Sequence, residues 1–174
     1  MDKLAIKAEE YARKCHGETN HMYDDMPYVD AHVAKVVEVG KRFKHLIPEE
    51  DWDLVECGLW THDIIEDTRQ THNNVSKTLS IHVAELAYAL TNEKGRTRKD
   101  RANEKYYEGI RDVRYADFCK NCDRIANVEH SLTKPIEEQK MLEMYKNEHA
   151  NYVRELYNKE YDEMFKYMEK LFNL

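Results

Sequence analysis

The sequence predicts a compact all-α fold, a helical bundle completed by amphipathic helices toward its C-terminal end. The 174 residues contain only five glycines and three prolines, so turn residues are too scarce for many short strands. Apolar residues recur at helical spacing among frequent charged residues, which is typical of helices that bury one face. We therefore expect almost no β-strand.

The length fits one domain, and a chain of this size buries a core without disulfides or a structural metal. We expect a single domain over residues 1–174, with its core at about 3–131 and a C-terminal helical extension at about 135–174. The N-terminal stretch has no signal-peptide pattern, so we expect a cytoplasmic protein with free thiols. Cys119 and Cys122 have CxxC spacing, but no second pair completes a zinc site, and core packing is the favoured interpretation.

The charge of the chain limits its partners. A formal net charge of −7 argues against nucleic acid, which is gripped by an excess of Lys and Arg. No stretch approaches the roughly 20 apolar residues that a membrane crossing needs. We expect a small-molecule partner, and the sequence leaves homo-oligomerisation open.

The N-terminal part predicts two helices. The first is expected from about Lys3 to Lys14, ending near Gly17. The polar stretch GETNHMYDD follows as a loop. Pro27 opens the next helical segment, in which valines at helical spacing form an apolar stripe beside His32.

The central part predicts three more helical segments. Pro48 and two glutamates begin a helix that leads into THDIIEDT, so this motif lies at a helix C-terminal end. A short helical turn is expected at residues 76–79. Ser80 then caps a helix that stops near Gly95.

The C-terminal half begins with NEKGRTRKDRANEKYY, the only dense basic run, which leads into a helix ending near Gly109. Basic residues in this run, Arg98 among them, either contact phosphate or form a solvated face, and we weigh the two equally. A helix is expected over residues 115–128. After Pro135, two amphipathic helices with Met, Tyr and Leu stripes complete the chain.

The motif HDIIED places four polar groups on one helical wall. At 3.6 residues per turn, Glu66 follows His62 by one turn and Asp67 follows Asp63 by one turn. Apolar neighbours put this wall next to the core, where unpaired carboxylates are costly, so it favours a bound cation. Alone, the motif also fits an ordinary helix end with solvated acidic residues.

A second polar cluster lies in KNCDRIAN. Lys120, Asp123 and Asn127 share one helical face, and Arg124 is adjacent to Asp123. Asp123 supplies a further candidate oxygen ligand, yet taken alone the cluster is better explained as a salt-bridged surface. The joint order of motifs changes this balance: a His after PY, then HDxxEDT about thirty residues later, then KxCDRxxN about sixty residues beyond.

In this order of motifs, over residues 8–131, the sequence resembles the HD superfamily of metal-dependent phosphohydrolases. Within it, the chain is similar to the (p)ppGpp hydrolase domain of the RelA/SpoT enzymes and their small stand-alone relatives. The resemblance implies an HD-domain helical bundle that holds one divalent metal ion with four ligands: His32, His62, Asp63 and Asp123. Such a donor set suits Mn, Fe, Co or Zn, and the resemblance favours Mn²⁺.

The same resemblance implies roles for the remaining site residues. Glu66 and Asp67 match the acidic pair that handles the attacking water, and Asn127 matches a nucleotide-contacting residue. Lys120 and Arg124 are further substrate-binding candidates, which either neutralise phosphates or pair with nearby carboxylates. The implied mechanism is attack on phosphorus by water, assisted by the metal and the acidic pair.

Two features depart from the family pattern. Alarmone hydrolases usually carry an Arg-Lys pair before PY, where this chain has NHMY at residues 20–23, and PYVDAH is one residue longer than the common PYxxH. The favoured function is (p)ppGpp 3′-pyrophosphohydrolase. The alternatives are a (d)NTP or other nucleotide phosphohydrolase of the same class, and a non-catalytic module that senses a nucleotide.

Overall fold

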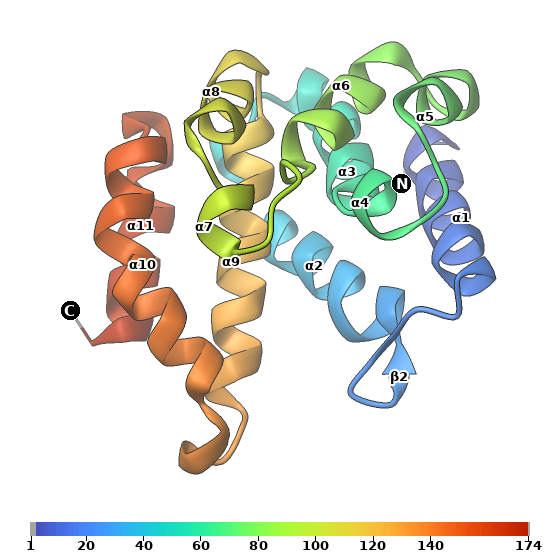
Figure 1. The fold of residues 1–174 in the computed structure, drawn as a ribbon. Coiled ribbons are helices and arrows are strands. Elements are labelled where there is room, and N and C mark those ends of the chain that lie inside the picture. The colour runs from blue at the N-terminus through green and yellow to red at the C-terminus, as the bar shows by residue number, and fades with distance from the viewer. Residues whose placement is uncertain (1–2, 174) are drawn as a thin grey trace.

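The computed structural model, which describes residues 3–173, consists of helices joined by short loops (Figure 1). Among these residues the only sheet is an antiparallel hairpin of two short strands, β1 (Met22–Tyr23) and β2 (Met26–Pro27). In this hairpin Met22 is paired with Pro27, and Tyr23 with Met26. The predicted all-α fold class is confirmed.

The α-helices occur in this order: α1 (Lys3–Glu18), α2 (Ala34–Arg42), α3 (Trp52–Thr61), α4 (Ile64–Asp67), α5 (His72–Thr78), α6 (Ile81–Leu90), α7 (Arg98–Arg101), α8 (Glu104–Asp112), α9 (Ala116–Leu132), α10 (Lys140–Leu156) and α11 (Asp162–Phe172). A π-helical turn, η1 (Val29–Val33), precedes α2. Short 3₁₀ turns are η2 (Lys44–Leu46), η3 (Glu49–Asp51), η4 (Ile136–Glu138) and η5 (Lys159–Tyr161). Within residues 3–173, no helix combines the length and apolar character needed to cross a bilayer.

The core forms where α1 and α2 pack on α3, and where α9 contacts α2, α3 and α6. Ala5, Ala8 and Ala12 of α1 are fully buried, and their small side chains allow this helix to lie close to α3. Gly40 of α2 serves the same purpose, because a Cβ at this position would overlap the side chain of Leu59 in α3. These close contacts fix the relative positions of the helices that carry the polar motifs.

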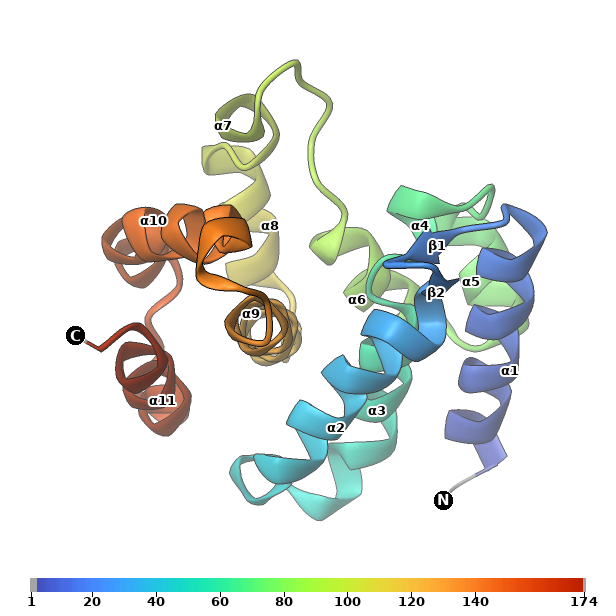
Figure 2. The same ribbon diagram turned by 90° about the horizontal axis from the view of Figure 1, so that it is seen from below.

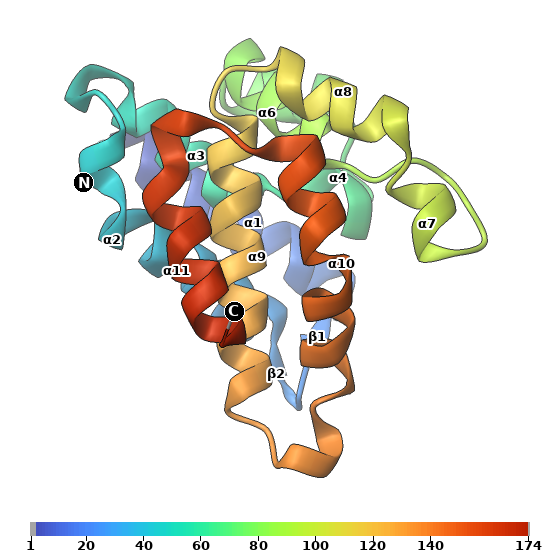
Figure 3. The same ribbon diagram turned by 90° about the vertical axis from the view of Figure 1, so that its left-hand side faces the viewer.

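The C-terminal helices pack against α9. Figures 1 and 2 show α10 and α11 on one side of α9 and α1 on the other. In Figure 3, which is viewed from the side of α10 and α11, α9 runs behind these two helices. Met164 and Met168 are buried on the inner face of α11, as their spacing predicted, and Phe165 is buried beside them. The two helices predicted after Pro135 are therefore confirmed.

Several helix boundaries differ from expectation. Helix α8 continues three residues past Gly109, because this glycine has an ordinary helical backbone and marks no stop. Helix α6 ends at Leu90, well before Gly95. The turn expected at residues 76–79 is part of α5, which begins earlier because Thr71 and Asn74 form a capping box.

The VDAH part of the segment PYVDAH lies in the π-helical turn η1, in which the Ala34 amide donates a hydrogen bond to the Val29 carbonyl. A π turn holds one residue more than an α-helical turn and occurs frequently at functional sites. It therefore absorbs the additional residue between PY and His32. The His32 side chain consequently faces inward and is 5% exposed.

Candidate functional site

The four residues predicted to bind metal come from three segments that meet in the interior. His32 lies in η1, His62 and Asp63 lie between α3 and α4, and Asp123 lies in α9. The expectation that one continuous helix carries HDIIED is wrong, because α3 ends at Thr61 and Asp63 leaves the helical conformation with φ −105° and ψ 2°. This break turns the doublet toward α9.

Three of these residues form a compact group of ligand atoms. His32, His62 and Asp123 are buried, and each offers one atom within 4.8 Å of the other two. Nε2 of His32 lies 3.3 Å from Nε2 of His62 and 3.2 Å from Oδ1 of Asp123. Two imidazole nitrogens and a carboxylate oxygen at such separations could hold one divalent metal ion.

Asp63, the fourth predicted ligand, lies at the edge of this group. Its Oδ2 is 2.9 Å from Nε2 of His62 and 3.7 Å from Nε2 of His32. The hydroxyl of buried Tyr28 donates a hydrogen bond to the same oxygen. Tyr28 thus orients the carboxylate from behind, as outer partners of metal ligands commonly do.

The orientation and charge of His62 also suit a cation site. Its Nδ1 lies 2.8 Å from the Leu59 carbonyl, an arrangement that places the proton on Nδ1 and leaves Nε2 to act as a ligand. Burial on its own would lower the pKa of His62, but the carboxylates of Asp63 and Asp123 outweigh it and raise the pKa to about 9. The pKa values of both carboxyls are correspondingly lowered despite their burial, chiefly by His62 for Asp63 and by Lys120 for Asp123. The cluster therefore attracts positive charge.

The residues around Asp123 hold it in place. Lys120 Nζ donates to Asp123 Oδ2 at 2.8 Å, and Asn127 Nδ2 donates to Asp123 Oδ1 at 2.6 Å. Burial opposes the charge of Lys120, but Asp123 dominates and raises the lysine pKa well above its usual value. Lys120 and Asn127, two of the three predicted substrate-binding residues, thus share the Asp123 carboxylate.

A cavity of about 190 Å³ brings these groups together with the predicted acidic pair. It is lined by Tyr28, His32, Asp63, Glu66, Asp67, Asn92, Arg98, Lys120, Asp123, Arg124, Asn127 and Tyr145. The acidic wall comes mainly from the segment around α4, and the basic side comes from α7 and α9. A small cavity that is lined by candidate metal ligands, further carboxylates and three basic side chains suits a phosphorylated ligand.

Glu66 and Asp67 differ in their surroundings. Asn92 donates its backbone N–H and its side-chain amide to the Glu66 carboxylate, at 3.1 and 3.0 Å. Burial, followed by the charges of Asp63 and Glu66, raises the pKa of Asp67 to about 7. Asp67 can therefore exchange a proton near neutral pH, whereas Glu66 is fixed by its neighbour.

Arg124 pairs with a residue that the sequence did not indicate. Its Nη1 lies 3.1 Å from Glu148 in α10, and its guanidinium stacks over the rings of Tyr145 and Tyr152 at 4.7 and 4.6 Å. The sequence did not single out Tyr145 and Asn92 as site residues. Tyr145 fitted an apolar stripe that was expected to face the core, and Asn92 belongs to no motif. Nothing in the sequence therefore indicated that either residue lines the site.

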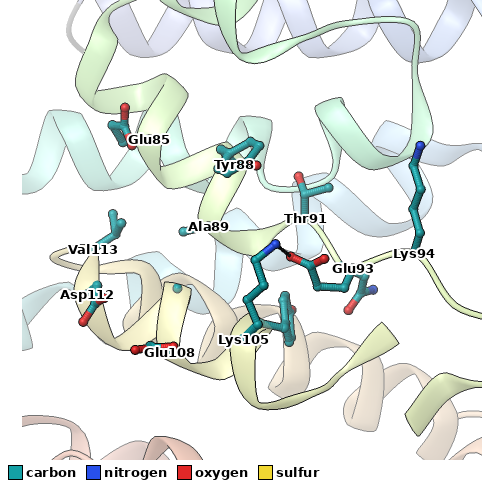
Figure 4. A pocket seen from close by; sticks show the side chains of 13 residues that line it. Glu85, Tyr88, Ala89, Thr91, Glu93, Lys94, Lys105, Glu108, Asp112 and Val113 are labelled. Carbon is teal, nitrogen blue, oxygen red and sulfur yellow. Dashed lines mark ion pairs between the residues drawn. The ribbon is translucent and has the colours of Figure 1, made fainter. Parts of the chain in front are cut away.

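A larger groove of about 630 Å³ lies next to this cavity, between α6 and α8 (Figure 4). The exposed side chain of Tyr88 and an ion pair of Lys105 with Glu93, 3.0 Å apart, line it. It holds none of the predicted site residues. Asn92 lines both the groove and the smaller cavity.

Comparison with known proteins supports the fold. No family model matches the sequence, and no curated protein matches it. A solved structure does match: a metazoan ortholog of SpoT that hydrolyzes ppGpp and plays a role in starvation responses. The TM-score is 0.72, at 17% sequence identity, over 99% of this chain and 96% of the other.

The chain has the fold of a stand-alone ppGpp hydrolase. The expected HD-domain bundle is therefore confirmed as a fold. At 17% identity this likeness shows the fold alone.

Proposed function

We propose that this protein is an HD-type, metal-dependent phosphohydrolase that acts on a nucleotide, with (p)ppGpp as its substrate and the 3′-pyrophosphate as the group removed. One observation carries the proposal. A single cavity is lined by the candidate ligands His32, Asp63 and Asp123 and by the acidic pair Glu66 and Asp67. A binding module has no need for this acidic pair beside a candidate metal site.

The donor set fits one divalent ion, which His32, His62, Asp63 and Asp123 would hold, with Mn²⁺ as the favoured metal. Such an ion supplies Lewis-acid polarisation of a phosphoryl oxygen and lowers the pKa of water. The carboxylates of Asp63 and Asp123 lie beside both imidazoles, and this concentration of negative charge favours a cation at this position.

Asp67 and Glu66 divide the handling of water between them. Asp67, with a pKa near 7, accepts the proton of the attacking water. Glu66, held by two hydrogen bonds from Asn92, orients that water toward phosphorus. The two carboxylates need no large rearrangement, since both already line the cavity.

The basic side of the cavity binds the substrate. Lys120 and Arg124 neutralise phosphate charge, joined by Arg98 from the basic run, and Asn127 contacts the nucleotide. Of the two interpretations of the basic run, contact with the ligand is favoured for Arg98, because this side chain lines the cavity.

A (d)NTP phosphohydrolase of the same class is the second candidate. The observation in its favour is the segment before Pro27, where residues 20–23 (NHMY), His21 among them, stand in place of the basic pair usual in alarmone hydrolases. Nδ1 of His21 lies 4.0 Å from Oδ2 of Asp67, and its ring stacks on Tyr28 at 3.9 Å between centroids. A neutral aromatic residue at this position favours a less densely charged substrate.

Chromatographic product analysis with Mn²⁺ separates the candidates. The protein is incubated with ppGpp, a panel of dNTPs and NADPH, alongside Glu66→Gln, Asp67→Asn and the exposed control Glu38→Gln. We expect GDP and pyrophosphate from ppGpp, at least about 100-fold less with either site variant, and no change with the control. A nucleoside or a shorter phosphate chain from dNTPs alone would identify the second candidate. Unchanged turnover in both site variants would refute the catalytic assignment.

A further inference from the structure

Glu148 in α10 lies between two guanidinium groups that come from different helices. Its Oε1 accepts a hydrogen bond from Arg98 Nε at 2.7 Å, and its Oε2 accepts one from Arg98 Nη2 at 3.2 Å. Oε2 also accepts from Arg124 Nη1 at 3.1 Å. Burial opposes ionisation of Glu148, but the two arginines dominate and lower its pKa, so the bridge is charged at neutral pH.

Both arginines line the candidate cavity, whereas Glu148 stands behind them. Their guanidinium carbons lie 5.5 and 4.7 Å from the centre of the Tyr145 ring, which also lines the cavity. Arg124 is 5% exposed, and its Nε is buried without a hydrogen-bond acceptor. A buried donor without a partner beside a cavity can pair with an acceptor that a ligand supplies.

The position of Arg98 depends on this bridge. Helix α7 is four residues long, buries none of them, and lies at the edge of the molecule (Figure 3). The contacts that hold Arg98 against α10 are its paired hydrogen bonds to Glu148 and its approach to the Tyr145 ring. Without Glu148, a long side chain on such an exposed turn samples many rotamers.

We propose that Glu148 is a positioning residue that aims Arg98 and Arg124 at an anionic phosphate group of the substrate, which makes α10 part of the substrate site. The inference rests on the proposed function for the identity of the ligand. If Glu148 acted only through its charge, neutralising it would change anion binding in the opposite direction from the change expected if it positions the arginines. A carboxylate near the cavity repels an anion, so charge alone predicts tighter binding when it is neutralised, whereas loss of positioning predicts weaker binding.

Calorimetric titration with inorganic pyrophosphate shows whether a change at Glu148 tightens or weakens anion binding, and it needs no turnover. We expect Glu148→Gln to weaken pyrophosphate binding by about fivefold or more, and Arg98→Ala to weaken it similarly. Since Glu148 acts through the arginine, adding Glu148→Gln to Arg98→Ala should weaken binding by less than twofold further. Glu148→Asp, which keeps the charge, should restore part of the affinity.

The matched control is Glu155→Gln, on the same helix, whose carboxylate pairs with Arg111 at 3.3 Å and does not line the cavity. It should lower the melting temperature about as much as Glu148→Gln and leave pyrophosphate binding unchanged. Steady-state kinetics on ppGpp should show a raised KM for Glu148→Gln with kcat altered less than twofold.

Unchanged or tighter pyrophosphate binding by Glu148→Gln would overturn the inference, as would fully additive losses in the double variant or no binding by the wild type. Absence of ppGpp hydrolysis by the wild type, with the binding pattern intact, would refute only the proposed function. The two failures are therefore distinguishable.

Discussion

Asn92 and Glu66, 26 residues apart, are joined by two hydrogen bonds, from the backbone N–H and the side-chain amide of Asn92 to the two oxygens of the Glu66 carboxylate. Asn92 follows α6 and lines both the candidate cavity and the neighbouring groove. The carboxylate is therefore fixed from outside its own helix.

Replacement of this asparagine tests whether the orientation of Glu66 matters for turnover. Asn92→Ala removes the side-chain donor and keeps the backbone donor, so we expect kcat to fall about tenfold with metal affinity unchanged. Asn92→Asp should cost more, because a second carboxylate repels Glu66. Steady-state kinetics and Mn²⁺ titration measure both quantities. A kcat within twofold of wild type for both variants would contradict a positioning role.

Metal binding should be visible in thermal stability. An ion that binds the folded state alone stabilises it by about 2.7 kcal/mol at a free concentration 100 times its Kd. We expect Mn²⁺ to raise the melting temperature of the wild type and EDTA to reverse the rise. Asp123→Asn should abolish this response. An equal rise in the variant would place the ion elsewhere.

Buried His16 should make the protein sensitive to acid. Burial lowers its pKa from the usual 6.5 to about 4, and the Asp63 carboxylate opposes this shift without overcoming it. Below pH 6.5 the unfolded chain therefore binds a proton that the folded protein does not take up until about pH 4. The stabilising contribution is complete above pH 6.5 and is lost as the pH falls toward 4.

Urea denaturation of the metal-free protein at several pH values measures this effect. The free energy of unfolding should fall by on the order of 2–3 kcal/mol more in the wild type than in His16→Gln between pH 7 and pH 4. The exposed control His45→Gln should follow the wild type. Parallel curves for the wild type and His16→Gln would show that His16 is not the group responsible.

Two glycines should respond to alanine with opposite signs. At Gly40 a Cβ would overlap Leu59, so Gly40→Ala should destabilise the protein by about 1–3 kcal/mol. At Gly109, in the middle of α8, a Cβ meets no atom within 4 Å, so Gly109→Ala should stabilise by up to about 1 kcal/mol. Thermal or chemical denaturation compares them, and effects of the same sign would contradict the packing of α2 on α3.

The sequence predicted the helices better than their ends. Apolar spacing located the helices, and Ser80 capped α6 as expected. Gly109 did not end its helix, because glycine stops a helix only where the backbone turns left-handed. The π turn before α2 was not predicted, since a single wide turn leaves the periodicity of a short segment almost unchanged.

From the sequence, the candidate site could be predicted only for residues that belong to a recognisable motif. The structure places Asp63, Glu66 and Asp67 of HDIIED around one cavity with four polar residues of KNCDRIAN, and we propose their function. Tyr145 and Glu148 could not be found in this way, because their place in the site depends on how α10 packs on α9. Tertiary packing decides which face of an amphipathic helix lines the cavity. The spacing of apolar residues along the sequence does not show what each face contacts.

Metal-dependent turnover of ppGpp is the measurement that tests the proposed phosphohydrolase function most directly. Protein stripped of metal is assayed before and after resupply of Mn²⁺, alongside Asp63→Ala, and GDP and pyrophosphate are quantified. We expect no turnover without metal, equal amounts of GDP and pyrophosphate with Mn²⁺, and none in the variant. Turnover that persists without metal, or survives in Asp63→Ala, would contradict a metal-dependent phosphohydrolase built on this site.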